Sequence, residues 1–431
     1  MDIYVVQPGD NIELIANKYG ISVERLISDN GLISPYTLVL GQAILILYPE
    51  RVYTVKSGDT LATIADSNGV SIMQLIRNNP FLHDRNYIYP GESFVINYSL
   101  GKEISVNGFA YSFINLDTLK RTLPYLTYIS IFNYRIGENA NIVDYGDDTE
   151  LIKIAKAYDT LPLLLISAFT VTGEVNLEYI YELLLNEEQQ DKLVNEMLQI
   201  VRTKKFSGIN AMISQITKSN QKLYLNVLTK LSKALRNEGY IFFLTINPNL
   251  KIINNTVTYE KIDYKSISEI VDKIIFFQNV WAMNKQPPSP VSNISSIRTF
   301  INYVSTIISP TILSIGKPLI GLDWTLPFSP GSSYANSMSL DSTMILAYEQ
   351  QTVIQFDELS QTPYYNYIRS SVGPPENHIV WFIDVRSIKA LNDLLIEYNM
   401  SGSGIWNLMI YNQQLWSILN ATFNIVKIPI I

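Results

Sequence analysis

An internal repeat near the N-terminus constrains this chain more than any other feature. The segment that begins at Tyr4 starts again at Tyr53, an offset of 49 residues (53 − 4). The matching positions are Val6 and Val55, Gly9 and Gly58, Asp10 and Asp59, Ile15 and Ile64, Ala16 and Ala65, Leu26 and Leu75, and Asn30 and Asn79. Matches in register over such a length indicate two copies of one small folding unit.

Each copy has the pattern of a strand, two helices and a second strand. In the first copy, Gly9 and Asp10 supply a turn, and apolar residues then recur at helical spacing. The pattern predicts a strand, two helices and a closing strand at residues 4–6, 12–16, 23–27 and 43–47. We therefore predict two βααβ modules that cover residues 1–49 and 50–98.

The remainder of the chain, residues 99–431, has a different pattern. From about Gly101, short apolar runs alternate with helical stretches, which is typical of an α/β fold. The predicted strands are 106–111, 128–134, 163–166, 208–213, 241–246, 273–277, 319–322 and 404–406. Residues 177–202 and 223–238 have the apolar spacing of helices. Eight strands alternating with helices predict a closed parallel (β/α) TIM barrel.

Composition excludes several classes of function. The 431 residues carry a net charge of −7 and no basic run, so we expect neither nucleic acid nor an anionic membrane as a partner. There is no cysteine, and His83 and His378 are far apart in sequence. We therefore expect no disulfide, no metal site and no cofactor. No apolar run reaches the ~20 residues that span a bilayer, and the N-terminus lacks a signal-peptide pattern.

Short motifs in both copies resemble the LysM signature. They are Val-Gln-Pro-Gly-Asp-Asn and Leu-Gly-Gln in the first copy, and Val-Lys-Ser-Gly-Asp-Thr-Leu and Tyr-Pro-Gly-Glu in the second. The resemblance covers residues 3–97. It implies that each module binds the acetamido groups of N-acetylglucosamine polymers in a shallow groove, largely through backbone amides. Two weak modules on one chain can give avidity on such a polymer.

The resemblance places this groove between the first strand–helix turn and the loop before the last strand. The implied residues are Gly9, Asp10, Asn11 and Ile12 with Asn30, Gly31, Leu32 and Ile33 in the first module, and Gly58, Asp59, Thr60 and Leu61 with Asn79, Pro80 and Phe81 in the second. The alternative for Asp10 and Asp59 is a purely structural role, in which the side chain forms the turn and caps the following helix.

Segments of the large domain are similar to family-18 glycoside hydrolases, and in particular to the LysM-bearing branch of spore cortex-lytic N-acetylglucosaminidases. The similar segments are residues 107–111, 126–134, 208–210, 262–264, 287–291, 321–327, 381–384 and 402–406. The resemblance implies a TIM barrel with a small α+β insertion within residues 325–400.

The chain departs from this family at the fourth strand. The family motif reads Phe-Asp-Gly-Ile-Asn-Ile-Asp-Phe-Glu. In the family, its Glu protonates the leaving glycosidic oxygen. The preceding Asp orients the acetamide of the substrate, which attacks in place of a protein nucleophile. In residues 206–214, Ser207, Met212 and Ser214 occupy the three acidic positions. A serine hydroxyl is too weak an acid for this step, and losing a general acid removes roughly 10²- to 10⁴-fold of rate. Asn279 and Ile320 also replace tyrosines that contact substrate in the family.

Other residues of the large domain have two interpretations each. Asp323 and Asp384 lie in segments that match the family, and a hydrogen bond or a helix cap explains them better than a replacement catalytic role. Trp281, Trp324 and Trp406 match aromatic residues of the family's cleft. They belong either to a residual sugar cleft or to the core, because aromatic rings serve both purposes.

The sequence therefore predicts a non-catalytic glycan-binding or structural protein of the bacterial spore envelope. Its expected ligand is peptidoglycan, cortex or a chitin-like polymer, and its expected partners include spore-coat proteins or other copies of itself. We expect synthesis in the mother-cell cytoplasm during sporulation and deposition on the spore surface. The alternatives are an active family-18 peptidoglycan N-acetylglucosaminidase and a self-assembling layer or crystal-forming protein.

Overall fold

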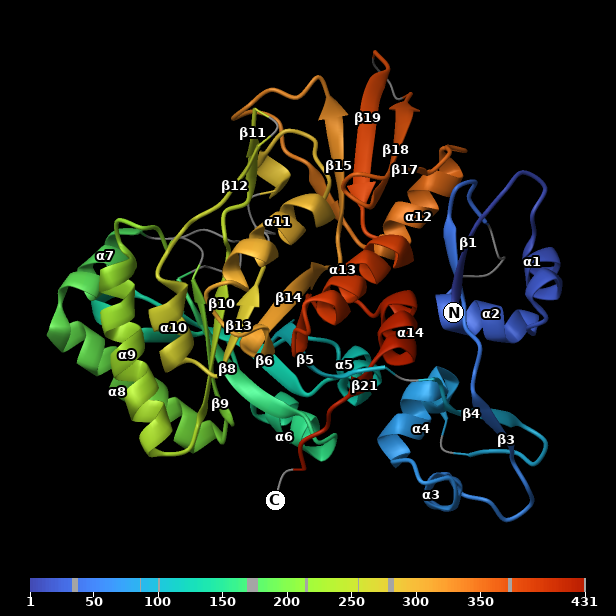
Figure 1. Cartoon of the computed structure of the whole chain (residues 1–431), viewed down its shortest axis with the longest axis horizontal. Helices are drawn as coiled ribbons and strands as arrows, with labels where there is room; N and C mark the ends of the chain where they lie inside the picture. Colours follow the sequence, from blue (N-terminus) through green and yellow to red (C-terminus); the bar gives the residue numbers. More distant parts are fainter. Residues whose placement is uncertain are drawn as a thin grey trace.

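The structure, a computed structural model, consists of a barrel with two small modules and an inserted sheet (Figure 1). It describes residues 1–32, 38–85, 87–99, 101–168, 177–213, 216–254, 256–277, 283–370 and 374–429. In Figure 1 the modules (blue) lie beside the C-terminal part of the barrel (red), and the inserted sheet rises above the barrel.

Both N-terminal modules have the predicted βααβ order. The first contains β1 (Asp2–Val5), α1 (Ile12–Tyr19), α2 (Val23–Asn30) and β2 (Ala43–Ile46), and the second contains β3 (Arg51–Thr54), α3 (Leu61–Ser67), α4 (Ile72–Asn78), the short 3-10 helix η1 (Pro80–Asp84) and β4 (Ser93–Asn97). The two strands of each module pair in antiparallel fashion. All four α-helices begin where a side-chain oxygen accepts the backbone N–H three residues on, at 2.8 to 3.1 Å; the capping residues are Asn11, Ser22, Thr60 and Ser71.

The large domain is a closed parallel barrel, as predicted. Among the described residues its eight strands are β5 (Glu103–Tyr111), β6 (Tyr128–Ile136), β8 (Leu161–Ser167), β9 (Gly208–Ile213), β10 (Ile241–Ile246), β13 (Lys273–Phe276), β14 (Leu313–Pro318) and β20 (Gly402–Trp406). Neighbours in this order pair in parallel, and β20 pairs with β5 to close the barrel. Two short strands extend the sheet: β7 (Ile142–Asp144) beside β6, and β21 (Asn424–Ile425) beside β5.

Helices cover the outside of the barrel. They are α5 (Leu116–Thr122), α6 (Thr149–Ala157), α7 (Leu177–Leu185), α8 (Glu187–Lys204), α9 (Gln221–Asn237), α10 (Tyr264–Ile270), α11 (Ile294–Val304), α13 (Val385–Glu397) and α14 (Gln413–Thr422). A hairpin of β11 (Lys251–Ile253) and β12 (Thr256–Thr258) follows β10. The single helix predicted over 177–202 is two helices. Asn186 separates them because its side chain caps α8 by accepting the N–H groups of Glu188 and Gln189.

The prediction for the seventh strand was wrong. The strand lies at Leu313–Pro318, whereas residues 319–322 were expected to form it. The sequence of β14 contains a glycine and a lysine, which interrupt the apolar pattern. Gly316 is needed because a Cβ there would lie 2.3 Å from the Phe277 ring. The more apolar segment that follows starts a strand of the insertion instead.

The insertion is a five-stranded antiparallel sheet with one helix. Its elements are β15 (Gly321–Leu326), β16 (Asn336–Met338), α12 (Leu340–Glu349), β17 (Gln355–Asp357), β18 (Thr362–Arg369) and β19 (Glu376–Phe382), and the strand order is β16-β15-β19-β18-β17. The insertion thus begins at Gly321, before residue 325, where its range was predicted to start. It follows β14 directly and returns the chain to α13.

The core has two layers that are separated by the barrel wall. The lumen holds mainly aromatic and large aliphatic side chains: Phe109, Tyr128, Phe132, Leu163, Leu165, Met212, Phe243, Ile275, Phe277 and Trp406. The layer between strands and helices is continuous with buried residues of the modules, including Leu45, Leu47, Val95 and Tyr98. The modules are therefore packed into the barrel's own core.

Polar contacts also fix the second module to the barrel. The guanidinium of Arg77 on α4 donates to the carbonyl oxygen of Pro124 at 3.1 Å and to Oδ1 of Asn420 at 3.3 Å. The Tyr125 hydroxyl donates to the Arg77 carbonyl oxygen at 3.1 Å. Burial lowers the pKa of Arg77 to about 10. In the part of the chain that the structure describes, no helix is long and apolar enough to cross a membrane.

Candidate functional site

The fourth barrel strand, β9, contributes neutral side chains to the lumen. Asn210 is fully buried and donates to the Ser130 hydroxyl at 2.9 Å, while the Thr245 hydroxyl donates to Asn210 Oδ1 at 2.9 Å. Ser130 in turn donates to Asn107 Oδ1 at 2.9 Å. These amides and hydroxyls thus connect β5, β6, β9 and β10, and none of the four side chains is ionisable.

Met212 lies two residues further along β9, towards the strand's C-terminal end. Its side chain is 5% exposed and belongs to the same lumen cluster as Phe132, Leu165 and Phe243. A thioether is a weak acceptor with no proton to give. Between Phe206 and Thr217 the sequence contains no Asp or Glu. The described end of this strand therefore packs as core and offers no acid or base.

The structure describes two of the other positions at which the chain departs from the family, Ser207 and Ile320. Ser207 precedes the strand, at the opposite end of β9 from Met212, and its backbone N–H donates to Pro162 at 2.8 Å. Ile320 is half-buried between β14 and the insertion. The predicted positions that lie outside the described residues are Ser214, Asn279 and Trp281.

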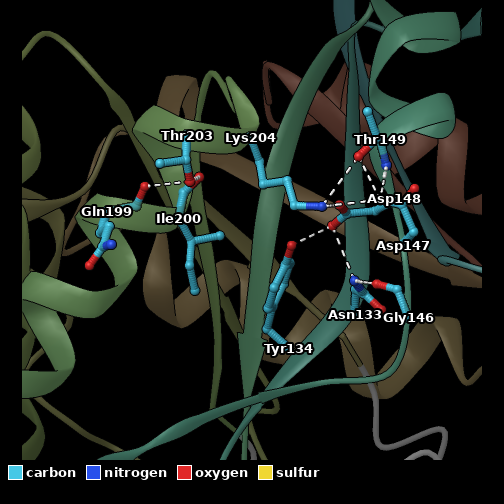
Figure 2. Close-up of polar contacts among 10 residues, drawn as sticks. All are labelled: Asn133, Tyr134, Gly146, Asp147, Asp148, Thr149, Gln199, Ile200, Thr203 and Lys204. Atoms are coloured by element: carbon cyan, nitrogen blue, oxygen red, sulfur yellow. Dashed lines mark hydrogen bonds and ion pairs between the residues drawn. The ribbon is translucent and has the colours of Figure 1, made fainter.

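A buried carboxylate near the second strand is bound in a structural network (Figure 2). Asp148 is fully buried, and its Oδ1 lies 3.1 Å from the ammonium of Lys204 on α8. Its Oδ2 accepts the Tyr134 hydroxyl at 2.6 Å and the Asn133 amide at 3.2 Å. Burial and this bond raise the pKa of Tyr134. Because Tyr134 belongs to the layer between strands and helices, the network joins β6 to α8 on the outside of the barrel.

Asp323 and Asp384 also have structural partners. Asp323, on β15, accepts the Tyr367 hydroxyl at 2.8 Å and contacts His378 Nδ1 at 2.9 Å, and all three side chains are buried. Asp384 caps α13 and forms an ion pair with Arg386 at 2.7 Å. Each carboxylate therefore acts as a hydrogen-bond acceptor that fixes the insertion or its junction with the barrel.

The two described tryptophans of the predicted sugar cleft are buried. Trp406 is 5% exposed, with its ring centroid 5.5 Å from that of Phe109 and 6.0 Å from that of Tyr111. Trp324 is fully buried, and its indole N–H donates to the carbonyl oxygen of Gln286 at 2.9 Å. Both rings are packed as core residues, so they present little surface to a sugar.

In the modules, the Gly-Asp turns have the same internal contacts. Asp10 accepts the Tyr4 hydroxyl at 2.6 Å and the Gln7 N–H at 2.7 Å, and Asp59 accepts the equivalent groups of Tyr53 and Lys56 at 2.9 and 2.7 Å. The bond to Asp10 raises the pKa of Tyr4 to about 12. The aspartates therefore close the turn, while Asn11 and Thr60 cap the helices.

Asn30 and Asn79 connect the second helix of each module to its last strand. The Asn30 amide donates to Leu26 and Leu45, and its Oδ1 accepts the Leu45 N–H at 2.7 Å. Asn79 makes the same three bonds to Leu75 and Val95. Both side chains are buried, so these bonds fix the fold of each module, and Asn30 also accepts a bond from Gln414 of the barrel at 2.9 Å.

The remaining predicted groove residues differ in exposure. Gly9, Gly31, Gly58 and Phe81 are exposed, Leu32 and Leu61 are half-buried, Ile12 and Pro80 are buried, and Ile33 lies outside the described residues. Sequence reasoning missed Tyr87 and Tyr89, which are exposed in the loop before β4. Two tyrosines in a predicted loop were the available signal. Among the described residues, no group of three or more His, Cys, Asp or Glu side chains is placed to hold a metal ion.

The fold and the site define a class of protein. Residues 102–409 match glycosyl hydrolases family 18, and residues 4–46 and 53–97 match the LysM domain. The chain therefore belongs to glycosyl hydrolases family 18 and carries two LysM domains before its barrel.

Individual relatives share this whole arrangement. The chain is 31% identical to a cortical fragment-lytic enzyme of Bacillus subtilis, over 99% of each protein, and 30% identical to a putative sporulation-specific glycosylase of the same organism, over 95% of each. The crystal structure of the spore cortex-lytic enzyme SleL from Bacillus megaterium superposes with a TM-score of 0.78 at 27% identity, covering 99% of this chain and 98% of that one.

Proposed function

We propose that this protein is a non-catalytic glycan-binding or structural component of the bacterial spore envelope, which holds N-acetylglucosamine polymers through its LysM modules. The observation that carries the proposal is the end of the fourth strand. There Met212 is buried among aromatic and aliphatic side chains, and the surrounding sequence contains no carboxylate. Hydrolysis by the family's route needs a proton donor and an acetamide partner at this place.

The relatives support the proposed ligand and setting. Two of them are named for cortical fragments and for sporulation, and the chain aligns with nearly their whole length. Peptidoglycan of the spore is accordingly the proposed polymer, and synthesis in the mother cell followed by deposition on the spore is the proposed route. Spore-coat proteins or further copies of the chain are the proposed protein partners.

The experiment combines a binding assay with a hydrolysis assay on the full chain. We expect the protein to sediment with insoluble cortex peptidoglycan, and to release no soluble product from cortex fragments or chitooligosaccharides above a buffer control. The Bacillus subtilis cortical fragment-lytic enzyme serves as the positive control. Failure to sediment would refute the binding part of the proposal.

An active peptidoglycan N-acetylglucosaminidase is the second candidate. It is favoured by the 31% identity to an enzyme over 99% of both chains. Product release that disappears when a lumen residue is substituted would establish this second function and overturn the first.

A further inference from the structure

The loop before the last strand has the same backbone structure in both modules. We call residues 38–42 the first loop and residues 87–92 the second loop. Three equivalent hydrogen bonds hold each loop. In the first loop the N–H groups of Gly41, Gln42 and Val39 donate to Val6 O, Val39 O and Gln42 Oε1, respectively. In the second loop the N–H groups of Gly91, Glu92 and Tyr89 donate to Val55 O, Tyr89 O and Glu92 Oε2, respectively. Val39 and Tyr89 therefore occupy equivalent positions.

The first loop is covered by the insertion. Val39 is 4% exposed and packs in a cluster with Tyr365, Phe382 and other insertion residues. The Ile354 N–H donates to the carbonyl oxygen of Leu40 at 2.9 Å. The approach is so close that a Cβ on Gly41 would lie 2.0 Å from the Ile354 carbonyl oxygen. The insertion therefore buries Val39 and holds the backbone of the first loop, while Leu40 stays 37% exposed.

The end of α2, which contributes to the predicted groove of the first module, also contacts the barrel. A Cβ on Gly31 would lie 2.8 Å from Cβ of Gln413 on α14. The Gln414 amide donates to Asn30 Oδ1 at 2.9 Å and to the carbonyl oxygen of Ala43 at 3.0 Å. The end of α2 in the first module is thus held against the barrel, while Gly9 at the other edge of the predicted groove stays exposed.

The second module is attached through a different face. Its polar contacts with the barrel include those of Arg77 and Asn78 on α4, and Tyr87 and Tyr89 of the second loop stay exposed. Tyr87 and Tyr89 are 58% and 56% exposed, and their ring centroids lie 5.2 Å apart at 60°. A Cβ on Gly91, the counterpart of Gly41, would meet no atom within 4 Å.

We propose that glycan binding by the two LysM modules is asymmetric: the Tyr87–Tyr89 pair of the second module stacks on N-acetylglucosamine rings, while the first module is a structural support. The inference rests on the glycan binding proposed above and assigns it to one module. Aromatic rings bind the apolar faces of sugars, and a tyrosine adds a hydroxyl for hydrogen bonds. Equivalent positions that hold Val39 and Tyr89 have thus taken on different roles.

The second loop is held in place before any ligand arrives. Glu92 accepts the Tyr89 N–H at 2.8 Å and forms an ion pair with Arg85 at 2.5 Å. The guanidinium of Arg85 also lies 5.0 Å from the centre of the Phe81 ring. Because these contacts order the loop in advance, little conformational entropy remains to be lost on binding.

The test compares three full-length proteins in co-sedimentation with insoluble peptidoglycan and with chitin. They are the wild type, the double variant Tyr87→Ala/Tyr89→Ala, and a matched control, Tyr334→Ala/Tyr348→Ala, which removes two tyrosines of similar exposure from the insertion. We expect the double variant to bind about tenfold more weakly, a change of about 1.4 kcal/mol, and the control to bind as the wild type does. Unchanged unfolding midpoints confirm that all three are folded.

A second measurement needs no variant. Hydrogen exchange with a soluble chitooligosaccharide should slow amides at residues 51–61 and 87–92 and leave those at 2–12 and 38–47 unchanged. Equal protection in both modules, or undiminished binding by the double variant, overturns the asymmetry and leaves the proposed glycan binding intact. Absence of binding by the wild type overturns the proposed function itself.

Discussion

At the scale of the residue, Met212 places a neutral, apolar side chain near the C-terminal end of the fourth barrel strand. Its neighbours in the lumen include Phe132, Leu165 and Phe243, and this apolar cluster gives a charge no compensating partner. In the polar layer next to it, the Asn210 amide is already bonded to the hydroxyl groups of Ser130 and Thr245. Around Met212 and Asn210 the lumen therefore holds neutral side chains.

Introducing the acidic residues of the family motif should destabilise the protein and produce no hydrolysis. Met212→Asp/Ser214→Glu introduces two carboxylates two residues apart in the sequence. We expect the free energy of unfolding to fall by about 2 kcal/mol or more, because a charge enters an apolar cluster. Met212→Leu, which keeps the volume, should lose less than about 1.5 kcal/mol. Urea unfolding and a cortex-fragment assay check both points; hydrolysis by the double variant would show that the cleft still positions substrate.

Lys317 makes stability depend on pH. Its side chain is fully buried on β14 and donates to the Ser403 hydroxyl at 2.6 Å, and burial lowers its pKa from the usual 10.5 to about 7. Between these two values the unfolded chain binds more protons than the folded protein, so the free energy of unfolding rises with pH, by at most about 1.4 kcal/mol per pH unit.

Lys317→Met removes the titrating group, so it should stabilise the protein most at pH 6 to 7 and progressively less as the pH rises towards 10. The check is the difference in unfolding free energy between wild type and variant over this range. A difference that does not change with pH would mean that the lysine is not titrating there.

At the scale of the element, the two module loops form a matched pair for mutagenesis. Gly41 and Gly91 have φ of 81° and 93°, so alanine strains the backbone by about 1 kcal/mol at either position. Gly41→Ala should cost more, because its Cβ would clash with the Ile354 carbonyl oxygen, whereas Gly91→Ala meets open space.

We expect a larger fall in the urea midpoint for Gly41→Ala, together with faster hydrogen exchange at residues 38–47. These changes report the separation of the first module from the insertion. Equal losses in the two variants would show that docking of the first loop contributes nothing to stability.

At the scale of the whole molecule, the modules and the barrel unfold together if they share one core. Leu45 and Val95 of the modules belong to the same buried layer as the barrel residues Tyr125 and Trp416. Arg77 adds a buried polar contact across the junction. Separating a module therefore exposes apolar surface on both sides.

We expect a single unfolding transition in urea. All five tryptophans lie between residues 281 and 416, so their fluorescence follows the barrel and insertion, while hydrogen exchange at residues 2–97 follows the modules. Both probes should give the same midpoint. Earlier loss of the modules would show that they are independent units tethered to the barrel.

The sequence by itself determined the modules and the barrel class. The βααβ units could be predicted because their signals are local: the Gly-Asp turns, apolar residues at helical spacing, and a repeat in register. The absence of Asp and Glu between Phe206 and Thr217 is likewise evident from the sequence alone. Such features depend on residues that are close in sequence.

Only the tertiary structure decided which of these features are exposed. The seventh strand was misplaced because a glycine and a buried lysine, Gly316 and Lys317, are accommodated by distant side chains that the local pattern does not contain. Val39 and Tyr89 hold the same place in a repeated loop, yet the insertion covers the first and leaves the second in solvent. Burial depends on segments that are hundreds of residues away, so a repeat can specify the same backbone twice and still leave one copy free to bind.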